Sequence, residues 1–520
     1  MRQLSGHDAG FLYSDTAHSN ANVSLLHIYD QSTAPGGMVR FKSILAHIER
    51  RLHCAPLFRQ RLQRVPLGLD HPYWVDDENF DLEYHVRHIA LPKPGDWRQF
   101  CIQASRIHAR AFDLGRPLWE VYVIEGLDSF LDLPPSSFAL LLKTHLSAID
   151  LAQVSSLTTL LHDISAAPLA EGPPEPWFAD AAPGQLSLLA QGAVRSATAP
   201  LRLARPLVRA ATHVAPAAAA LASEMLLRPK NLPVTRFNAV VSPHRVFETR
   251  RFTEAEFAAV CALVDGASVD DAALAVCGGA LRRYLDAQGE LPEGHSLAAI
   301  VPVPRIGDTS ATDAALAWRH VALGTDIADA VQRLMAVQAQ RQAAPDSVSR
   351  VFGSRELAEV AEQASGAVLA WTKRMVGRAG ARVGRRSPPA NCVVSPVPAP
   401  AQPQFLCGAR MTYCSAILPI NDGLGLAFAV TRYDGQVVIS PTSCRELMPD
   451  PETFAQCLRD SFQEYLALAA YTPSTKRAGA APQPAPRKAP ARQSKVTARV
   501  TAAAPRASRP GKARRPSRPA

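Results

Sequence analysis

The segment from Phe138 to Leu151 constrains this chain most, because an apolar run in it ends in residues with functional chemistry. Hydrophobic residues fill 138–142, His145 closes the run, and Asp150 follows five residues later. A run of this length is typical of a buried strand, and the tight turn after such a strand can carry polar groups into a cleft. The sequence therefore predicts a buried strand that delivers His145 and Asp150 to a functional site.

Amphipathic helical stretches alternate with short apolar runs along the chain, which indicates the α/β class. Expected helices lie at 39–52, 100–112, 270–286 and 451–468, and expected strands lie at 119–125 and 297–303. Pro-rich sequence at 168–183 marks a boundary between two such halves, which form a cleft between them. The predicted parts are a first half at 1–180, a helical linker at 181–235, a second half at 236–471 and a tail at 472–520.

The linker is rich in Ala and Leu and holds five arginines against a single acid, Glu224, between Leu186 and Lys230. One interpretation is a helix that packs across both halves. The other is an interfacial helix whose arginines contact anionic lipid headgroups. Pro200, Pro206 and Pro216 are expected to interrupt any long helix here, which weighs against the second interpretation.

The net charge of +10 comes from the tail and not from the body of the protein. Thirteen Lys and Arg lie between Lys476 and Arg518, and 472–520 contains no Asp or Glu. Low-complexity sequence of this kind is predicted to be disordered. Its charge favours tethering to an anionic membrane or lipid-inclusion surface, with a solubilising appendage as the alternative. It has no aromatic residue to stack on bases, so sequence-specific nucleic-acid binding is not expected.

The nine cysteines are scattered without a CxxC pair, and no secretory leader precedes them. They are expected to be reduced thiols of a cytoplasmic protein, neither disulfides nor metal ligands. No apolar run approaches the ~20 residues that a membrane-spanning helix needs. Any association with the inner membrane or with lipid inclusions is therefore expected to be peripheral.

Several short blocks occur in a fixed order over roughly residues 1–470. They are Leu4-Ser5 with Asp8 and Phe11-Leu12, Pro56 to Leu62, Pro66 to Leu69, Phe80-Asp81, His85 to His88, Arg116 to Glu120, Ile124 to Leu127, Ser242 to Arg245, Gly279 to Leu285 and Val301 to Val303. Together with 138–151, this order closely resembles the bacterial wax ester synthase/diacylglycerol acyltransferase family of CoA-dependent acyltransferases. The resemblance implies an α/β fold of two chloramphenicol-acetyltransferase-like halves around a central tunnel.

His145 and Asp150 match the first His and the Asp of the family's HHxxxDG motif, but Leu146 replaces the second His and Leu151 the Gly. In the family, the second His is the general base that takes the proton of the attacking hydroxyl. Successive strand residues face opposite sides of a sheet, so His145 should point away from the missing base. His145 is then either a base that a rotated turn re-aims or a core histidine with backbone partners.

The resemblance assigns further roles. Asp150 braces the motif loop, with Arg305 as a partner suggested by position. Leu146, Ser147, Trp119 and Ser395 are assigned to substrate binding, with packing as the other role of Trp119. His244 and Arg245 are assigned to the CoA phosphates, or else form a solvated loop pair.

Further departures affect the same chemistry. The family's Ser-Asn-Val-Pro-Gly-Pro segment is Ser395 to Pro400 here, with Pro396 and Ala399 in place of the Asn and Gly. Pro396 has no backbone N–H to donate to an oxyanion. The Asn expected in the strand before Tyr433 is Ala427.

The implied reaction is acyl transfer from acyl-CoA, as co-substrate, to the hydroxyl of diacylglycerol or a fatty alcohol, without a bound cofactor, a metal or a covalent acyl-enzyme. The alternative is a catalytically impaired homologue that binds acyl-CoA or lipid, or that regulates an active paralogue. Nothing in the sequence indicates an oligomeric state.

Overall fold

A computed structural model describes most of the chain, and residues 1–472 form one compact unit. The described residues are 1–127, 133–134, 136–167, 177–213, 232–303, 317–343, 388 and 390–471. Arg305 and the predicted basic tail lie outside them. Among the helices described, none has the length and apolar character needed to span a membrane.

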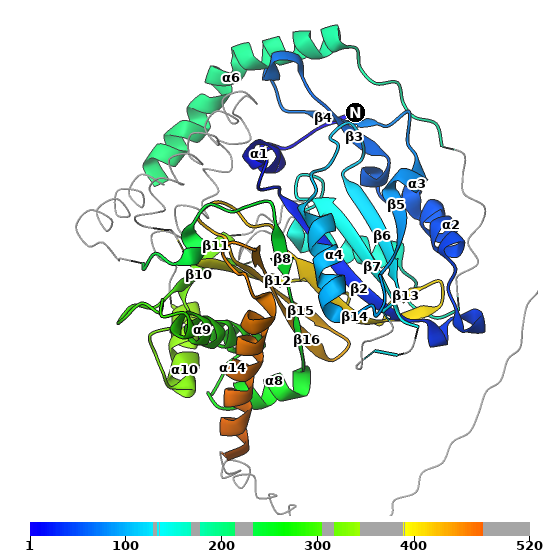
Figure 1. The fold of residues 1–520 in the computed structure, drawn as a ribbon. Helices are drawn as coiled ribbons and strands as arrows, with labels where there is room; N and C mark the ends of the chain where they lie inside the picture. The colour runs from blue at the N-terminus through cyan, green and yellow to red at the C-terminus, as the bar shows by residue number, and fades with distance from the viewer. Residues whose placement is uncertain are drawn as a thin grey trace, which may run out of the picture. The chain divides into compact units, whose positions relative to one another are not determined.

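A mixed sheet forms the centre of the first half (Figure 1). In the described part of the chain its order is β13 (Phe405–Leu406), β14 (Ala409–Ile417), β2 (Asn22–Asp30), β7 (Phe138–His145), β6 (Trp119–Glu125) and β5 (Val86–Ala90). The β5–β6 pair is parallel, and the other neighbours are antiparallel. Every residue of β7 is buried, as expected for a central strand without a solvent-exposed face.

Helices cover both faces of this sheet. On one face, α2 (Phe41–Arg51) and α5 (Val154–Leu161) pack over Leu25, Leu140 and Leu142. On the other face, α4 (Trp97–Ala109) packs over Leu26 and Leu141. Because side chains alternate along a strand, Lys143 and His145 belong to the α4 face.

The second half is built on a second mixed sheet. Within the residues described, it consists of β11 (Ala317–Ala322), β10 (Ala298–Val303), β12 (Cys392–Val397), β15 (Ala427–Tyr433), β16 (Gln436–Cys444) and β8 (Arg245–Phe247), with β9 (Arg250–Thr253) also paired to β16. Its helices are α8 (Glu254–Cys261), α9 (Val269–Ala287), α10 (Ala330–Gln342) and α14 (Pro451–Tyr471). Gly278 and Gly279 let α9 pack closely, because a Cβ atom would lie 2.2 Å from Leu323 O at the first and from Ser461 Oγ at the second.

The remaining elements belong to the first half and to the linker that follows it in the chain. A small sheet has the order β1 (Arg2–Gln3), β4 (Tyr73–Asp76) and β3 (Gln60–Gln63). The other helices used below are α1 (Gly6–Ser14), α3 (Leu82–His85), α6 (Gln185–His213) and the 3-10 turns η5 (Pro66–Gly68) and η6 (Leu151–Gln153).

One segment of the second half completes the sheet of the first. The chain leaves the second sheet after β12, forms β13 and β14 beside β2, and returns as β15. The β14–β2 pairing runs from Arg410 opposite Asp30 to Ile417 opposite Ser24. The two halves are therefore joined by backbone hydrogen bonds inside one sheet.

The structure confirms the predicted α/β class and the two halves. The strand expected at 119–125 has those bounds in the structure, and the expected helices lie within a few residues of α2, α4, α9 and α14. One expectation is wrong: α6 runs without a break from Gln185 to His213, through Pro200 and Pro206. A proline removes one N–H donor, and on a surface helix water can satisfy the carbonyl it leaves free. Pro216 lies outside the described residues.

Candidate active site

The motif strand β7 ends where the sequence predicted, in a turn with a fixed backbone. His145 lies opposite Asn22 of β2. The Leu146 N–H donates to Ala21 O at 2.9 Å, and the Ala148 N–H donates to His145 O at 2.8 Å. Both bonds hold the chain reversal at the end of the strand, so the side chains at 145 and 146 have defined directions.

His145 is buried, and both of its ring nitrogens have partners. Nε2 lies 3.0 Å from Asp15 Oδ2, and Nδ1 lies 2.7 Å from Ser147 Oγ. The Ser147 N–H also points to Nδ1 at 3.1 Å. An N–H can only donate, so Nδ1 accepts and the neutral ring carries its proton on Nε2, toward Asp15. His145 is thus engaged as a brace between the motif turn and the N-terminal segment.

Asp15 extends this brace, because its other oxygen accepts the N–H of Ala21 at 2.9 Å. Ala21 in turn accepts from Leu146, so Asp15, Ala21 and the motif turn form a closed set of bonds. The order Asp15, His145, Ser147 has the composition of a hydrolase triad. Its serine is buried and does not line the cavity described below. We therefore assign the three residues to holding the turn.

Leu146 lies on the other side of the strand. Its side chain is half-buried and packs against the large apolar cluster that contains Leu140 and Leu142. Leu151 packs against the same cluster. Position 146, where the resemblance leads us to expect a general base, therefore presents hydrocarbon, which can neither accept nor donate a proton.

A cavity of about 570 Å³ lies where the motif meets the second half. Leu151 lines it from the first half, and residues 396–401, Val430 and Tyr433 line it from the second. Its walls thus include the segment in which Pro396 and Ala399 replace the family's Asn and Gly. His145, Leu146, Ser147 and Trp119 are not among the lining residues.

The charged residues at this cavity do not suit phosphate groups. Three carboxylates, those of Glu254, Asp270 and Asp434, line it together with one guanidinium, that of Arg432. Arg432 Nε is already paired with Glu254 Oε1 at 3.2 Å. Asp434 is likewise paired with Arg410 at 2.8 Å. Because both arginines already have carboxylate partners and the other walls are largely apolar, the cavity fits a neutral or hydrocarbon ligand better than the phosphates of CoA.

Lys143 belongs to the same strand face as His145, and its side chain is fully buried. Its Nζ donates to Arg110 O at 2.7 Å and lies 3.4 Å from Glu120 Oε2. Glu120 also accepts from the Tyr122 hydroxyl at 2.9 Å, and Arg87 lies 3.9 Å from its other oxygen. Burial lowers the pKa of Lys143 to about 8, although Glu120 opposes the shift.

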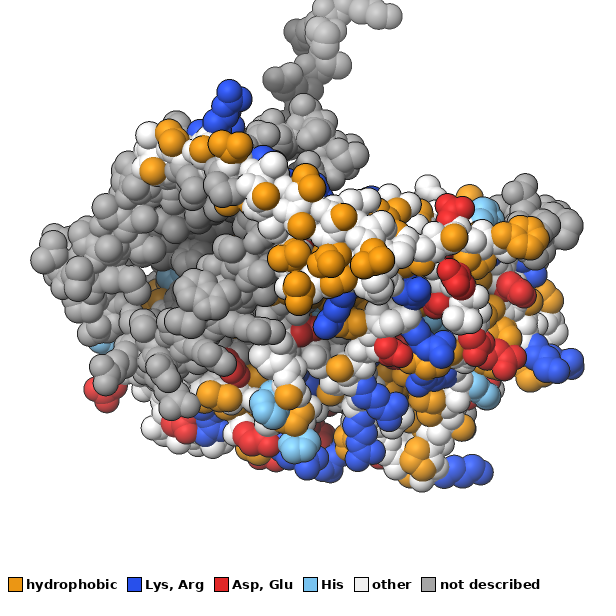
Figure 2. All heavy atoms as spheres, turned by 90° about the horizontal axis from the view of Figure 1, so that it is seen from above, with side chains coloured by type: hydrophobic (Ala, Val, Ile, Leu, Met, Phe, Trp, Pro, Cys, Tyr) orange, Lys and Arg blue, Asp and Glu red, His pale blue; other side chains and the backbone are white. Residues whose placement is uncertain are grey.

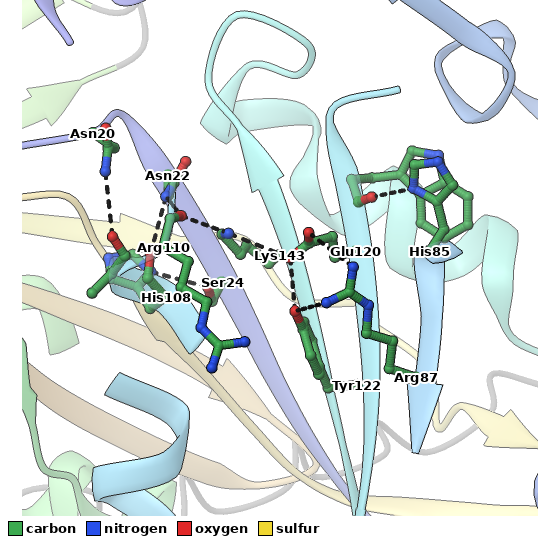
Figure 3. Close-up of polar contacts among 12 residues, drawn as sticks. Asn20, Asn22, Ser24, His85, Arg87, His108, Arg110, Glu120, Tyr122 and Lys143 are labelled. Carbon is green, nitrogen blue, oxygen red and sulfur yellow. Dashed lines mark hydrogen bonds and ion pairs between the residues drawn. The ribbon is translucent and has the colours of Figure 1, made fainter. Parts of the chain in front are cut away.

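These polar groups close the C-terminal end of α4. The last carbonyls of a helix have no partner within it. Here His108 O and Arg110 O accept from Asn22 Nδ2 at 3.0 and 2.9 Å, and Ala109 O accepts from Asn20 Nδ2 at 3.3 Å (Figure 3). The Lys143 ammonium completes the set and lies where the helix dipole favours a positive charge. The α4 face at this end of β7 is therefore structural, which leaves the Leu146 face for a ligand.

The lowered pKa of Lys143 predicts a pH effect on stability. Below about pH 8 the amine is charged in both the folded and the unfolded chain, and the full penalty of burying it applies. Between about 8 and 10.5 the unfolded chain binds more protons, so the free energy of unfolding should rise with pH. We expect this rise to be about 1 kcal/mol per pH unit and to be absent in Lys143→Met.

Urea unfolding of both proteins at about pH 7.5, 8.5 and 9.5 measures this difference. Buried cysteines such as Cys414, whose pKa burial raises to about 12, give an opposite trend, but both proteins share it. Parallel profiles for the two proteins would show that Lys143 does not titrate in this range.

The other predicted site residues of the first half are structural in their contacts. Trp119 is buried, donates from Nε1 to Phe58 O at 3.0 Å, and stacks on His85 with ring centroids 4.7 Å apart. Asp150 follows the motif turn and accepts from the Gln153 N–H through its carbonyl at 2.9 Å. Its suggested partner, Arg305, is outside the described residues.

Comparisons with known proteins agree with this geometry. The model of the wax ester synthase/diacylglycerol acyltransferase catalytic domain matches residues 4–273, and that of the WS/DGAT C-terminal domain matches 315–465. A protein of Mycobacterium tuberculosis strain CDC 1551 / Oshkosh, provisionally named a diacylglycerol O-acyltransferase, is 30% identical over 475 residues, or 90% of each chain. The chain belongs to the wax ester synthase/diacylglycerol acyltransferase family.

Further relatives and structures extend the comparison. A second protein with that provisional name, from M. tuberculosis strain H37Rv, is 32% identical over 506 residues and covers 87% of this chain and 95% of its own. The solved wax ester synthase/diacylglycerol acyltransferase of Marinobacter aquaeolei VT8 superposes with a TM-score of 0.61 at 24% identity, over 90% of this chain and all of that one. A trichothecene 15-O-acetyltransferase of Fusarium sporotrichioides has a TM-score of 0.54 at 9% identity, over 89% and 95%. Both structures show the shared fold.

The remaining predicted residues of this family member lie in the second half. Ser395 is buried in β12, and its Oγ donates only to Pro396 O at 3.3 Å among the contacts described. His244 is exposed and pairs with Glu446 at 3.2 Å, and Arg245 donates to His18 O at 2.6 Å. None of the three lines the cavity.

Sequence analysis missed Asp15, Asn22 and the ion pair of Lys143 with Glu120. Asp15 lies 130 residues from His145, and no local pattern marks the contact. Lys143 did carry a signal, because a charge inside an otherwise apolar strand must find a partner. Glu120 lies at the start of the neighbouring strand β6, so it could have been predicted as this partner.

Proposed function

We propose that this protein is an acyl-CoA-dependent O-acyltransferase that moves a long-chain acyl group to diacylglycerol or a fatty alcohol. The observation that carries the proposal is the match of both family domains, in order, with relatives that align over 90% of the chain. The apolar cavity beside Leu151 supports a hydrocarbon ligand. Acyl-CoA is the co-substrate, no resident cofactor is invoked, and the protein works in the cytoplasm at the surface of a lipid phase.

The rate is expected to be low. A general base contributes about 10² to 10⁴ to the rate of such a transfer, and Leu146 cannot supply one. His145 would have to leave Asp15 and Ser147 to reach the opposite side of the strand. Transfer would then rest on positioning and on oxyanion donors, and Pro396 removes one main-chain donor from the segment 395–400.

The same observations favour a second candidate function. A family member with hydrocarbon at the base position and its remaining motif histidine fully bonded can bind acyl-CoA or lipid without turnover. It would then act as an acyl-ligand carrier or as a regulator of an active paralogue. The two candidates differ in a single measurable property, the release of CoA in the presence of an acceptor.

We expect slow release of CoA thiol from palmitoyl-CoA that depends on added hexadecanol or diolein. The assay uses wild type and His145→Ala, with far-UV circular dichroism to confirm that both are folded. Release that persists in His145→Ala supports transfer by positioning alone, and release lost in that variant shows that transfer needs His145, either as the base or as the brace of the motif turn.

Binding is measured in parallel as the shift in melting temperature with palmitoyl-CoA. A shift without release with either acceptor would overturn the enzyme proposal in favour of the second candidate. Neither a shift nor release at saturating ligand would refute both.

A further inference from the structure

The surface helix α6 has three distinct sides, and the first of them rests on the first half. Leu188 and Ala199 are buried there, and Gly192 allows a close approach, because a Cβ atom would lie 2.9 Å from Val65 Cγ1. Ser196 Oγ donates to Leu69 O at 2.6 Å. These contacts place one side of α6 on η5 and its neighbours and leave the other sides free to face outward.

The outward side of α6 is apolar, the reverse of what a surface helix in water presents. Leu186, Val194, Leu201 and Val208 are 63 to 82% exposed. They follow one another at intervals of eight, seven and seven residues, so they form one stripe along the helix. Four further exposed residues of this stripe are small and apolar, namely Ala190, Ala193, Ala197 and Ala204, and Thr212 adds one hydroxyl near the end of the helix. Figure 2 views the molecule from this side and shows hydrophobic side chains gathered on its surface.

The third side of α6 is cationic. The helix contains no Asp or Glu, and at ~100° per residue Arg195, Arg202, Arg205 and Arg209 fall in one band between the stripe and the buried side. Arg205 and Arg209 are exposed, whereas Arg195 is half-buried and lies 3.3 Å from Asp70. A band of arginines beside an apolar stripe has the charge pattern that anionic headgroups complement.

A neighbouring segment carries a further exposed apolar residue. Leu67, in η5 beneath α6, is exposed and has a φ of 60°, a conformation that costs energy for a residue other than glycine. Folding alone gives no reason to hold a leucine in this conformation with its side chain in water. Contact of Leu67 with an apolar phase would supply one.

We propose that α6 is a membrane-docking surface that lies along an anionic lipid bilayer, with the apolar stripe among the acyl chains and the arginines at the headgroups. A helix of this length spans about 40 Å of the membrane plane. A protein partner would also bury the stripe, but a helix that carries arginines from 195 to 209 and no Asp or Glu of its own fits the uniform negative charge of a lipid surface better. The proposal stands on α6 alone and does not depend on catalysis.

The test is flotation of the full chain with vesicles of phosphatidylcholine, with and without one-quarter phosphatidylglycerol. The variant Val194→Ser/Leu201→Ser/Val208→Ser removes the stripe without changing charge. The matched control is Met38→Ser/Val240→Ser/Met335→Ser, which alters three apolar residues that are 44 to 58% exposed and lie outside α6. Salt of about 0.5 M screens the charges of 476–518, so the apolar contribution is measured separately.

We expect wild type and the matched control to bind anionic vesicles alike at this salt, and the stripe variant to bind at least about tenfold more weakly. Arg205→Gln/Arg209→Gln should weaken binding to anionic vesicles at low salt. Equal binding by the stripe variant and wild type at about 0.5 M salt, or unchanged binding of Arg205→Gln/Arg209→Gln to anionic vesicles at low salt, would overturn the proposal. If the stripe variant does not fold, the single Leu201→Ser takes its place, with circular dichroism as the check.

Discussion

Replacing Leu146 with His is expected to raise acceptor-dependent CoA release from palmitoyl-CoA by about 10² to 10⁴. The backbone at 146 is already held by its bond to Ala21, so the new imidazole would take the direction of the leucine side chain. That direction is opposite to His145, on the side of the strand that faces the apolar cluster shared with Leu151. An imidazole there would be desolvated and neutral, the form a general base needs.

The matched control is Leu146→Gln, which is polar and of similar size but accepts no proton near neutral pH. Both variants are assayed with hexadecanol and with diolein, and their melting temperatures are compared with wild type. A gain in Leu146→Gln equal to that in Leu146→His would mean that polarity and not basicity limits the reaction. No gain in either variant would indicate that the defect lies in the segment 395–400. The next variant to assay would then be Pro396→Asn/Ala399→Gly.

Replacing Arg51 with Met is expected to lower the free energy of unfolding by about 3 to 5 kcal/mol. Arg51 Nη2 lies 2.5 Å from Asp163 Oδ1, and both side chains are buried. Arg51 also donates to His47 Nδ1 at 2.8 Å, while His47 lies 3.0 Å from Leu161 O through Nε2. Burial, followed by the charge of Arg51, lowers the pKa of His47, so in the wild type the charged partner of the Asp163 carboxylate is the guanidinium.

Asp163 also joins the halves, because its backbone exchanges hydrogen bonds of 2.9 and 2.8 Å with Phe405 of β13. Urea unfolding of Arg51→Met, Asp163→Leu and the double variant forms a cycle. The double variant should recover most of the loss, because it leaves no unpaired buried charge. A double variant as unstable as the sum of the single ones would show that the ion pair is not the source of the effect.

Local patterns predicted the elements of this fold and not the contacts between them. The strand at 119–125 and the motif strand were predictable because their apolar runs are complete within a few residues. The continuity of α6 could not be predicted from local patterns. Its prolines indicate a break, whereas the contacts that hold the helix involve Val65 and Leu69, which are distant in the chain. Likewise, His145 was expected to face away from Leu146, but its bond to Asp15 depends on where residue 15 folds.

The same reasoning applies to the candidate site. The sequence places Leu146 where the resemblance expects the second motif histidine, since this is a matter of residue identity at a known spacing, and the loss of a base there stays a prediction. The sequence could not show that Trp119 is enclosed between Phe58 and His85, or that Ser147 is bonded to His145. Such facts depend on tertiary packing, which places residues far apart in the chain against one another.

The insertion of β14 beside β2 has a consequence for synthesis on the ribosome. Until residue 417 has emerged, β2 is an edge strand with a free row of backbone donors and acceptors. The sheet of the first half therefore lacks β14, although β7 is already paired to one side of β2, while roughly 270 further residues are translated. At ~5–20 residues per second this interval lasts tens of seconds, long enough for a chaperone to engage the exposed edge. If residues 1–180 were expressed alone, β14 would never cover the edge of β2, so the two halves of this protein should be produced together.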